Sequence, residues 1–294
     1  MAAPARTRGG QQDALPSSGL VVRQVADRVL LRNFLERDRL FAAYALCDLD
    51  EREFARTRWG VAFRDGEPQA VALEYGGPAP QPLFAMGQPS GIAAVLRDVV
   101  RPRVAFLACA EAALPEVERV YRVDGGPTMV RMWVDRSTFR PAPGATARLL
   151  PAEIADLNRL YDLGLTSWLP AESIARGVYY GVRLGGRLVA AAGTHVISPE
   201  ARLAVVGNVM THRDYRGRGY AKITTSAVTQ ELLRACDQVV LNVRADNPPA
   251  LAAYRALGYQ EHVRFAERLV HRRSGTWDTI VAPLRRLFVP HKEP

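Results

Sequence analysis

Apolar residues recur along the C-terminal half at two spacings, and these spacings predict its secondary structure. Strict alternation of apolar and polar residues is typical of strands, whereas apolar residues three and four positions apart are typical of helices. Gly185-Gly186 lies between two strand-like segments and indicates a hairpin turn. The pattern predicts a strand over 145–150, helices over 151–162 and 170–176, strands over 179–184, 187–196 and 202–211, a helix over 219–235, a strand over 238–243, a helix over 248–257 and an extended segment over 259–270.

The N-terminal half repeats this order less clearly. Its pattern predicts a helix over 27–46, strands over 59–63 and 70–75 around the turn Asp65-Gly66, a strand over 83–86, a helix over 90–100, a strand over 104–109, a helix over 115–121 and a strand over 129–134. The common order suggests one fold present twice, with the first copy diverged. No residue-level repeat accompanies it.

A cluster of prolines and glycines at 140–144 separates the two halves. With 294 residues in the chain, at roughly 100–200 residues per domain, we expect two domains, 19–143 and 144–272. Residues 1–18 are rich in Ala, Gly, Pro, Gln and Arg, which predicts a disordered leader, and they lack the apolar segment of a secretory signal. The tail, 273–294, is expected to hold one more basic helix over 277–288.

Charge and cysteine content narrow the class of protein. The net charge of +9 is almost all arginine, since only two of the 39 basic residues are lysines. This excess of arginine over lysine is typical of GC-rich codon use. The spread of the arginines over both halves disfavours nucleic acid as a partner. The three cysteines are scattered without metal-ligand spacing, so we expect a cytoplasmic protein with no metal site and no disulfides. No apolar run reaches the roughly 18 residues that cross a bilayer.

The segment 209–221 carries the clearest chemical signal. An apolar strand runs into a glycine-rich turn that opens directly into a long helix. The first turn of a helix has unpaired N–H groups, and the helix dipole adds roughly half a positive charge there. Gly217 and Gly219 remove the side chains that would keep a phosphate off this backbone. Three arginines add positive charge: Arg213, Arg216 and Arg218. A plain strand-to-helix turn also uses glycine, but the leading arginine and both flanking elements favour a phosphate-binding loop.

Two blocks in this half resemble the GNAT superfamily of acyl-CoA N-acyltransferases. Arg216-Gly-Arg-Gly-Tyr-Ala221 is similar to the R/Q-x-x-G-x-G/A signature of that family. The block 241–259 resembles the strand, Asn-containing loop, Tyr-bearing helix and Gly-Tyr end that follow it. The resemblance implies an α/β GNAT fold, with a mixed, mostly antiparallel sheet flanked by helices, in tandem here. Residues 179–195 and the N-terminal extension also resemble, less closely, the two-part members of this superfamily that have an FR47-like C-terminal domain.

The resemblance also assigns cofactor contacts by position. It implies acetyl-CoA or another acyl-CoA as cosubstrate, with the adjacent strand backbone pairing with pantetheine. The resemblance implies that Tyr254 is the general acid that protonates the departing thiolate. The alternative interpretation is an amphipathic tyrosine that packs in the core. The cofactor contacts implied are Val209, Met210, Thr211, Arg216, Gly217, Arg218, Gly219, Tyr220, Ala221, Asn247 and Tyr254.

The general base is not evident. Many family members have a glutamate on the strand before the loop, whereas 205–208 reads Val-Val-Gly-Asn here. The weak candidates are Asn208 acting through a water, His195 and Glu261; a neutral amine at alkaline pH needs no dedicated base. Lone histidines are more often hydrogen-bonded core residues than catalysts.

Aromatic and glycine positions elsewhere have two interpretations each. Trp168, Leu169 and the pair Tyr179-Tyr180 either line an acceptor pocket or pack in the core. In the N-terminal half, 87–91 opens a helix where a second phosphate loop would lie. It lacks the leading arginine, which indicates a non-catalytic domain.

These observations favour an N-acyltransferase that moves an acyl group, expected to be acetyl, from acyl-CoA to a primary amine by direct attack in a ternary complex. The acceptor is left open among small amines, amino acids, antibiotics, and protein N-termini or lysines. The first alternative is a non-catalytic acyl-CoA-binding or regulatory module, because the strand carboxylate is absent. The second is an RNA-associated protein that uses its arginines.

Overall fold

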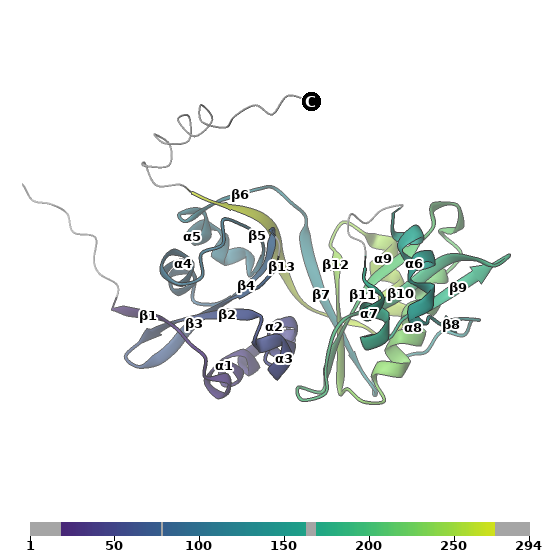
Figure 1. Cartoon of the computed structure of the whole chain (residues 1–294), viewed down its shortest axis with the longest axis horizontal. Helices are drawn as coiled ribbons and strands as arrows, with labels where there is room; N and C mark the ends of the chain where they lie inside the picture. The colour runs from purple at the N-terminus through teal and green to yellow at the C-terminus, as the bar shows by residue number, and fades with distance from the viewer. Residues whose placement is uncertain (1–18, 78, 163–168, 274–294) are drawn as a thin grey trace, which may run out of the picture.

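The computed structural model describes residues 19–77, 79–162 and 169–273. Figure 1 shows two halves, one on each side of long central strands, with helices packed on the sheet in both. The N-terminal half holds helices α1 (Arg28–Leu35), α2 (Ala43–Cys47), α3 (Glu51–Phe54), α4 (Pro89–Asp98) and α5 (Leu114–Glu118). The C-terminal half holds helices α6 (Ile154–Tyr161), α7 (Ala171–Arg176), α8 (Tyr220–Leu232) and α9 (Pro248–Ala256).

The strands of the described residues form one continuous sheet across both halves. Its order is β1-β2-β3-β4-β5-β13-β7-β12-β11-β10-β9-β8, and β6 pairs with β13. The first seven strands are β1 (Leu20–Gln24), β2 (Thr57–Arg64), β3 (Glu67–Tyr75), β4 (Gln81–Gly87), β5 (Val104–Cys109), β6 (Tyr121–Val123) and β7 (Thr128–Asp135). The remaining six are β8 (Ala147–Arg148), β9 (Tyr180–Leu184), β10 (Arg187–Ser198), β11 (Leu203–Thr211), β12 (Gln238–Arg244) and β13 (Gln260–Arg272).

The two halves share one topology. In each, a run of antiparallel strands ends in a parallel pair, β4 with β5 in the first half and β11 with β12 in the second. A helix connects the members of each pair, α4 in the first half and α8 in the second, as parallel strands require. The expected duplication of the fold is therefore present in the strand order.

The halves exchange their last strands. β7 belongs to the N-terminal half in sequence but pairs with β12, whereas β13 follows the C-terminal helices and pairs with β5 and β6. β7 and β13 also pair with each other, which makes the sheet continuous. The proposed domain limits, 19–143 and 144–272, thus describe the order along the chain, while each half contains a strand from the other in space.

A hydrophobic cluster joins the halves across one face of the sheet. Phe41 and Leu46 of the N-terminal half pack with Val205, Val240 and Phe265, which come from β11, β12 and β13. Two further clusters cover the opposite face, one under α4 and one under α8 and α9. Burial of this shared apolar surface stabilises the contact between the two halves, together with the strand pairing.

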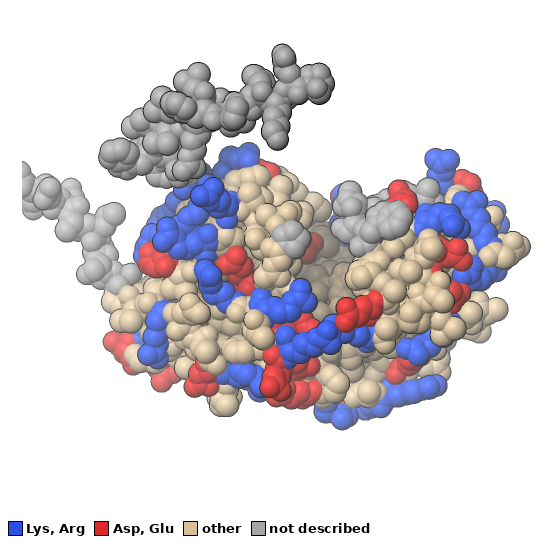
Figure 2. Space-filling model, viewed as in Figure 1, with Lys and Arg blue, Asp and Glu red and all other residues tan. Residues whose placement is uncertain are grey.

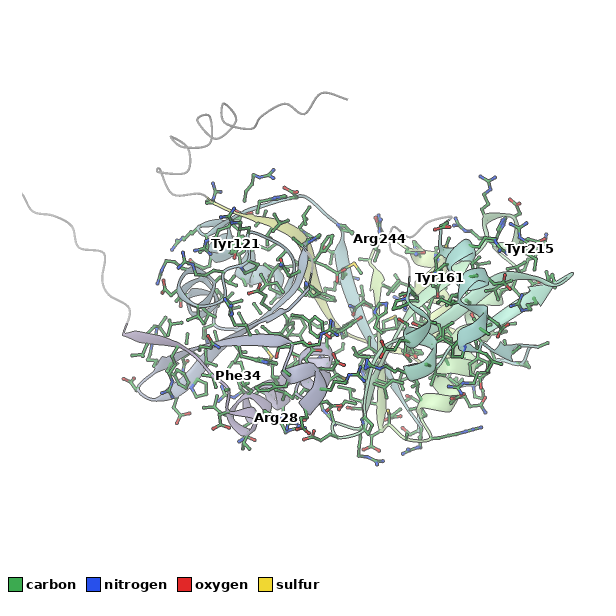
Figure 3. The ribbon with its side chains drawn as sticks, viewed as in Figure 1. Arg28, Phe34, Tyr121, Tyr161, Tyr215 and Arg244 are labelled. Carbon is green, nitrogen blue, oxygen red and sulfur yellow. The ribbon has the colours of Figure 1, made fainter. Side chains whose placement is uncertain are left out.

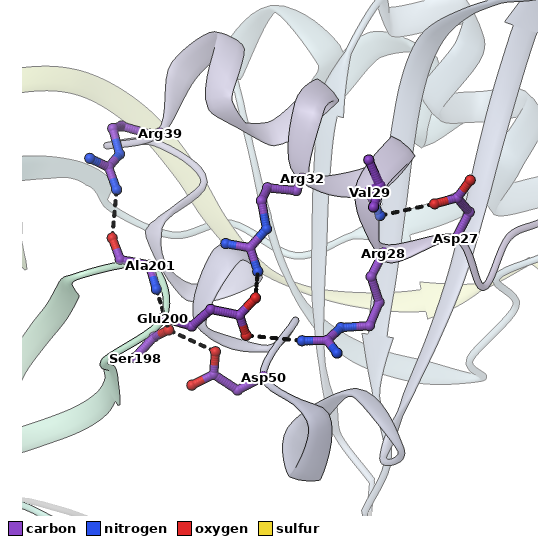
Figure 4. A network of polar contacts seen from close by, with 9 residues as sticks. All are labelled: Asp27, Arg28, Val29, Arg32, Arg39, Asp50, Ser198, Glu200 and Ala201. Carbon is purple, nitrogen blue, oxygen red and sulfur yellow. Dashed lines mark hydrogen bonds and ion pairs between the residues drawn. The ribbon is translucent and has the colours of Figure 1, made fainter.

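Polar contacts add to this junction at the β10–β11 turn. Glu200 accepts hydrogen bonds from Arg28 at 3.0 Å and Arg32 at 2.5 Å, both on α1 (Figure 4). Ser198 donates to Asp50 at 2.7 Å. The side chains of Arg28, Arg32 and Glu200 are all partly exposed. We therefore infer that these ion pairs orient the two halves more than they contribute to the free energy of unfolding.

The predicted elements occur in the predicted order, with a few corrections. The single helix expected over 27–46 is divided into α1 and α2, and the short helix α3 was not predicted. The helix expected over 115–121 ends at Glu118, and Tyr121 begins strand β6. The strand expected over 145–150 is only the two residues of β8. β1 was not predicted; it is a short edge strand with Val21 largely exposed, so alternation there is weak. The leader 1–18 and the tail helix expected at 277–288 lie outside the described residues.

Within the described residues, no helix combines the length and the apolarity that a bilayer crossing demands.

Candidate functional site

The site is organised where β11 leaves its parallel neighbour. β11 pairs with β12 from Leu203 to Val206 only, although it continues to Thr211 against β10. No strand of the described residues pairs with the other backbone edge of 207–211, which leaves a gap between β11 and β12; Arg216 Nε donates to the Thr211 carbonyl at 3.3 Å. A gap of this kind exposes N–H and C=O groups to which an extended ligand can pair as an added strand.

A bulge at Asn208 sets the direction of this free segment. The pairing with β10 shifts register between Ala191/Gly193, and Asn208 has φ of +52°, a conformation that non-glycine residues rarely adopt. The backbone carbonyl of Asn208 accepts a hydrogen bond of 2.6 Å from Tyr161 on α6, a side chain labelled in Figure 3. The fold thus fixes the bulge from one side while leaving Val209 to Thr211 accessible.

The glycine-rich turn lies directly beyond this strand. Gly217 and Gly219 have φ of +77° and +81°, and a Cβ on either would meet no atom within 4 Å. The backbone N–H groups of residues 217–222 have no hydrogen-bond acceptor in the part of the chain that the structure describes. Open space and unpaired amides at the start of a 13-residue helix are what a phosphate group requires.

The side chains around the turn are open to solvent. Arg213, Arg216 and Arg218 are exposed, and Arg218 stacks over the ring of Tyr215 at 5.4 Å, near the outer end of the C-terminal half in Figure 3. Thr211 Oγ1 is buried and has no partner among the described residues. An orphaned buried hydroxyl beside a free strand edge fits a polar ligand group at that position.

Asn247 and Tyr254, the two predicted cofactor contacts at helix α9, have different surroundings. Asn247 is the N-cap of α9, and its side-chain oxygen accepts from the Ala250 N–H at 3.3 Å. Tyr254 is 7% exposed and packs 6.1 Å from the ring of Tyr259. Burial raises the pKa of Tyr254 to about 12. The Tyr254 hydroxyl has no hydrogen-bond partner among residues 19–77, 79–162 and 169–273, so its proton is available as a donor to a ligand.

The structure separates the three base candidates. His195 contacts Asn208, with 3.2 Å between Nε2 and Oδ1, so these two lie together beside the free strand. Glu261 is ion-paired with Arg255 of α9. Glu261 pairs with Met132, whose side chain lies in the cluster under α8 and α9. His195 contacts Tyr44, which packs against the cluster that joins the halves. Glu261 is therefore on the opposite face of the sheet from His195.

Two of the predicted pocket residues have core contacts instead. Tyr179 is 1% exposed and donates to the Thr194 carbonyl at 3.0 Å. Tyr180 donates to Glu231 of α8 at 2.7 Å. Leu169 is held through its backbone by the Asn158 side chain, and Trp168 lies outside the described residues.

Sequence reasoning missed two residues that the N-terminal half brings to this junction. Tyr44 of α2 reaches His195, with 2.6 Å between its hydroxyl and Nδ1. Arg131 of β7 is 2% exposed and stacks on Tyr44, 5.4 Å from the ring centre. Neither has a local sequence signal, because the contacts join positions up to 151 residues apart. No cluster of potential metal ligands occurs among the described residues.

Residues 149–259, which contain β11, α8 and α9, match the model of the acetyltransferase (GNAT) family. An acetyltransferase of Yersinia pestis is 36% identical over 62 residues, which are 20% of this chain and 44% of that protein. The chain thus matches less than half the length of this relative.

Solved structures extend the likeness to both halves. A Drosophila protein has a TM-score of 0.67 at 14% identity, covering 87% of this chain and 99% of that one. A tandem GNAT protein from the clavulanic acid biosynthesis pathway has a TM-score of 0.54 at 15% identity, with the same coverage. At these identities the likeness concerns the fold, and it confirms the predicted mixed sheet with flanking helices in a tandem GNAT arrangement. The narrower likeness to FR47-like members stays a prediction.

Proposed function

We propose that the protein is an acyl-CoA-dependent N-acyltransferase that moves an acetyl group to a primary amine in a ternary complex. The observation that carries the proposal is the free edge of β11 leading into a turn with unpaired amides at the start of α8. The match of residues 149–259 to the acetyltransferase (GNAT) family supports the same reaction class.

The binding roles follow from the geometry of the turn and the strand. The pyrophosphate of CoA would accept from the amides of Gly217 to Ala221, with Arg216 beside it as a screening charge. The pantetheine arm would pair with Val209 and Thr211 along the free edge of β11. Asn247 is a cap of α9, so only its side-chain NH₂ is left for a contact with pantetheine.

The chemical roles concern the two ends of the thioester. The N–H of Met210 would donate to the thioester oxygen, which gains negative charge when the amine attacks. Tyr254 would protonate the departing thiolate. The pKa of Tyr254, raised by burial to about 12, keeps its hydroxyl protonated at physiological pH, as a general acid requires.

A non-catalytic acyl-CoA-binding module is the second candidate. Residues 205–208 of β11 carry no carboxylate, and Glu261 is ion-paired on the other face of the sheet. The module therefore shares the whole cofactor site but lacks a direct carboxylate base.

The two candidates differ in turnover and agree in binding. Calorimetry should detect one acetyl-CoA per chain, and a thiol-release assay with a panel of primary amines should show saturable turnover. Binding without turnover on any amine would favour the module. Absence of binding to the folded protein would contradict both.

A further inference from the structure

His195 has both ring nitrogens occupied, one from each half of the molecule. Nδ1 lies 2.6 Å from the Tyr44 hydroxyl of the N-terminal half. Nε2 lies 3.2 Å from Oδ1 of Asn208 at the bulge in β11. A substrate amine therefore has no free imidazole nitrogen to approach, and His195 alone is not a direct base in this arrangement.

The neighbouring hydrogen bonds define which nitrogen carries the proton. The Tyr179 hydroxyl donates its single proton to the Thr194 carbonyl, so it can only accept a hydrogen bond from Asn208. Nδ2 of Asn208 is the donor, 3.1 Å from the Tyr179 hydroxyl. The Asn208 oxygen then faces His195 and accepts from Nε2–H. Nδ1 is left with a lone pair, which accepts the proton of the Tyr44 hydroxyl.

The surroundings keep both groups neutral at rest. Desolvation by the walls of the junction lowers the pKa of His195, although its side chain keeps a solvent-exposed surface. Burial raises the pKa of Tyr44, and Arg131 opposes this effect. The other charged or titratable groups that act on Tyr44 come from its own segment and from β13: Cys47, Asp48 and Glu267.

Arg131 is held rigidly beside the phenol. Its guanidinium donates to the carbonyls of Leu40 and Phe41 and to Asn242 on β12. A fixed cation 5.4 Å from the Tyr44 ring centre stabilises negative charge that develops on the phenol oxygen.

The imidazole is also fixed against the strand proposed to bind pantetheine. A Cβ on Gly207 would lie 2.2 Å from His195 Nε2, so the ring rests directly on the β11 backbone. Asn208, its other partner, immediately precedes Val209. The Tyr44–His195 pair is thus anchored within two residues of the N–H proposed to bind the thioester oxygen.

From this geometry we propose that Tyr44 is the catalytic residue that takes the proton of the acceptor amine, with His195 as its positioning residue and proton store. The proposal rests on the proposed function. When the amine nitrogen bonds to the thioester carbon, its N–H proton passes to the Tyr44 oxygen, and the Tyr44 proton moves to His195 Nδ1. The C–S bond then breaks and Tyr254 protonates the thiolate. His195 releases the proton it received to solvent, and the Tyr254 oxygen takes up a proton from solvent, which restores the resting state.

The relay assigns a task to the N-terminal half, which has no phosphate loop of its own. Tyr44 and Arg131 come from that half, and His195 and Asn208 come from the other. The acceptor side of the reaction therefore requires both halves, whereas the cofactor side lies within the C-terminal half.

The relay can be tested first without any acceptor. Nitrogen-15 NMR of the histidine rings in the full chain, with His195→Gln to assign the signal, should show His195 neutral at pH 7 with the proton on Nε2. Tyr44→Phe should change the Nδ1 shift. An Nδ1–H tautomer or a charged ring at pH 7 in the wild type would overturn the relay.

Kinetics with the most active amine of a panel provide the second test. Tyr44→Phe should lower kcat by about 10²–10⁴-fold, the usual effect of losing a proton-transfer group, with an unchanged Kd for acetyl-CoA. Tyr75→Phe is the matched control, because Tyr75 is another tyrosine of the N-terminal half whose hydroxyl bonds a side chain, Glu53. It should keep the wild-type kcat.

The pH profile separates a proton relay from a structural role. His195 must be neutral to accept a proton, and burial lowers its pKa from the usual histidine value, so wild-type kcat should rise with pH on the acidic side of that value. Tyr44→Phe should abolish this limb of the profile. Wild-type kcat in Tyr44→Phe would overturn the relay and leave the proposed function intact. A wild type that binds acetyl-CoA but turns over no amine would overturn both the relay and the enzymatic function.

Discussion

The strand-to-helix turns within the two parallel strand pairs use glycine for opposite reasons. At the start of α8, a Cβ on Gly217 or Gly219 would meet empty space, and both residues have positive φ. At the start of α4, a Cβ on Gly87 would lie 2.3 Å from the Gln69 carbonyl oxygen, and one on Gly91 would lie 2.8 Å from the Cβ of Ala70. The first turn leaves room for a ligand, whereas the second is filled by its own sheet.

The difference shows how a duplicated fold can divide its work. Both halves keep the parallel strand pair and the connecting helix. Only the second keeps the open, amide-lined turn, while the first has Pro89 at the start of α4, which removes one N–H donor. Glycine content alone therefore does not identify a phosphate site; the space around the glycine does.

The largest effect is expected when a carboxylate is placed at the open glycine before α8 and, for comparison, at an open glycine elsewhere. Gly219→Glu should abolish acetyl-CoA binding, with a loss of affinity of at least about 100-fold. The added carboxylate would occupy the space proposed for the pyrophosphate and would repel its negative charge. Gly66→Glu is the matched control: Gly66 lies in a hairpin of the N-terminal half with φ of +84° and no neighbour within 4 Å. Calorimetry of the two variants compares them directly, and equal affinities would refute the loop assignment.

The helices after the parallel pairs provide the second test. Tyr254→Phe should lower kcat by about 10²–10⁴-fold with little change in acetyl-CoA affinity, since it removes only the proton donor. The corresponding helix of the first half, α5, reads LPEVE and has no such donor. Because the acid form is required and burial raises the pKa of Tyr254 to about 12, wild-type kcat should show no decline from this group between pH 8 and 10. Steady-state kinetics that find full turnover in the variant would remove Tyr254 from the mechanism.

A single methyl group should distinguish a packed glycine from an open one. Gly91→Ala should lower the free energy of unfolding by about 1–3 kcal/mol, because its Cβ is forced against Ala70 at the interface of α4 and β3. It should leave acetyl-CoA affinity unchanged. Urea unfolding measures the first effect and calorimetry the second; undiminished stability would mean that this turn has space after all.

The smallest effect is expected where the halves meet at the surface. Glu200→Ala removes two ion pairs with α1, but all three side chains are partly exposed. The free energy of unfolding should fall by less than about 1 kcal/mol, and the loss should shrink as salt is added. A larger, salt-independent loss in urea unfolding would show that this clamp, not the shared hydrophobic cluster, holds the halves together.

The local pattern predicted most elements and the glycine-rich turn before α8, but it did not reveal the pairing between halves. Hydrophobic spacing located α8, which buries one face, and the apolar run of β12, which is buried on both faces. It did not show that β13 pairs with β5, since alternation does not name a partner strand. Tyr44 was part of an ordinary helical pattern, and its contact with His195 depends on the packing of α2 onto the other half.

The exchange of β7 and β13 has a consequence for biosynthesis. A nascent chain that has emerged only through residue 250 would have made every helix of its first half, yet β5 would still lack its neighbour β13. An unpaired strand edge is prone to pairing with other chains. The edge of β5 therefore stays unpaired until residue 272 has left the ribosome. Slower translation would lengthen the time during which this edge can pair with other chains.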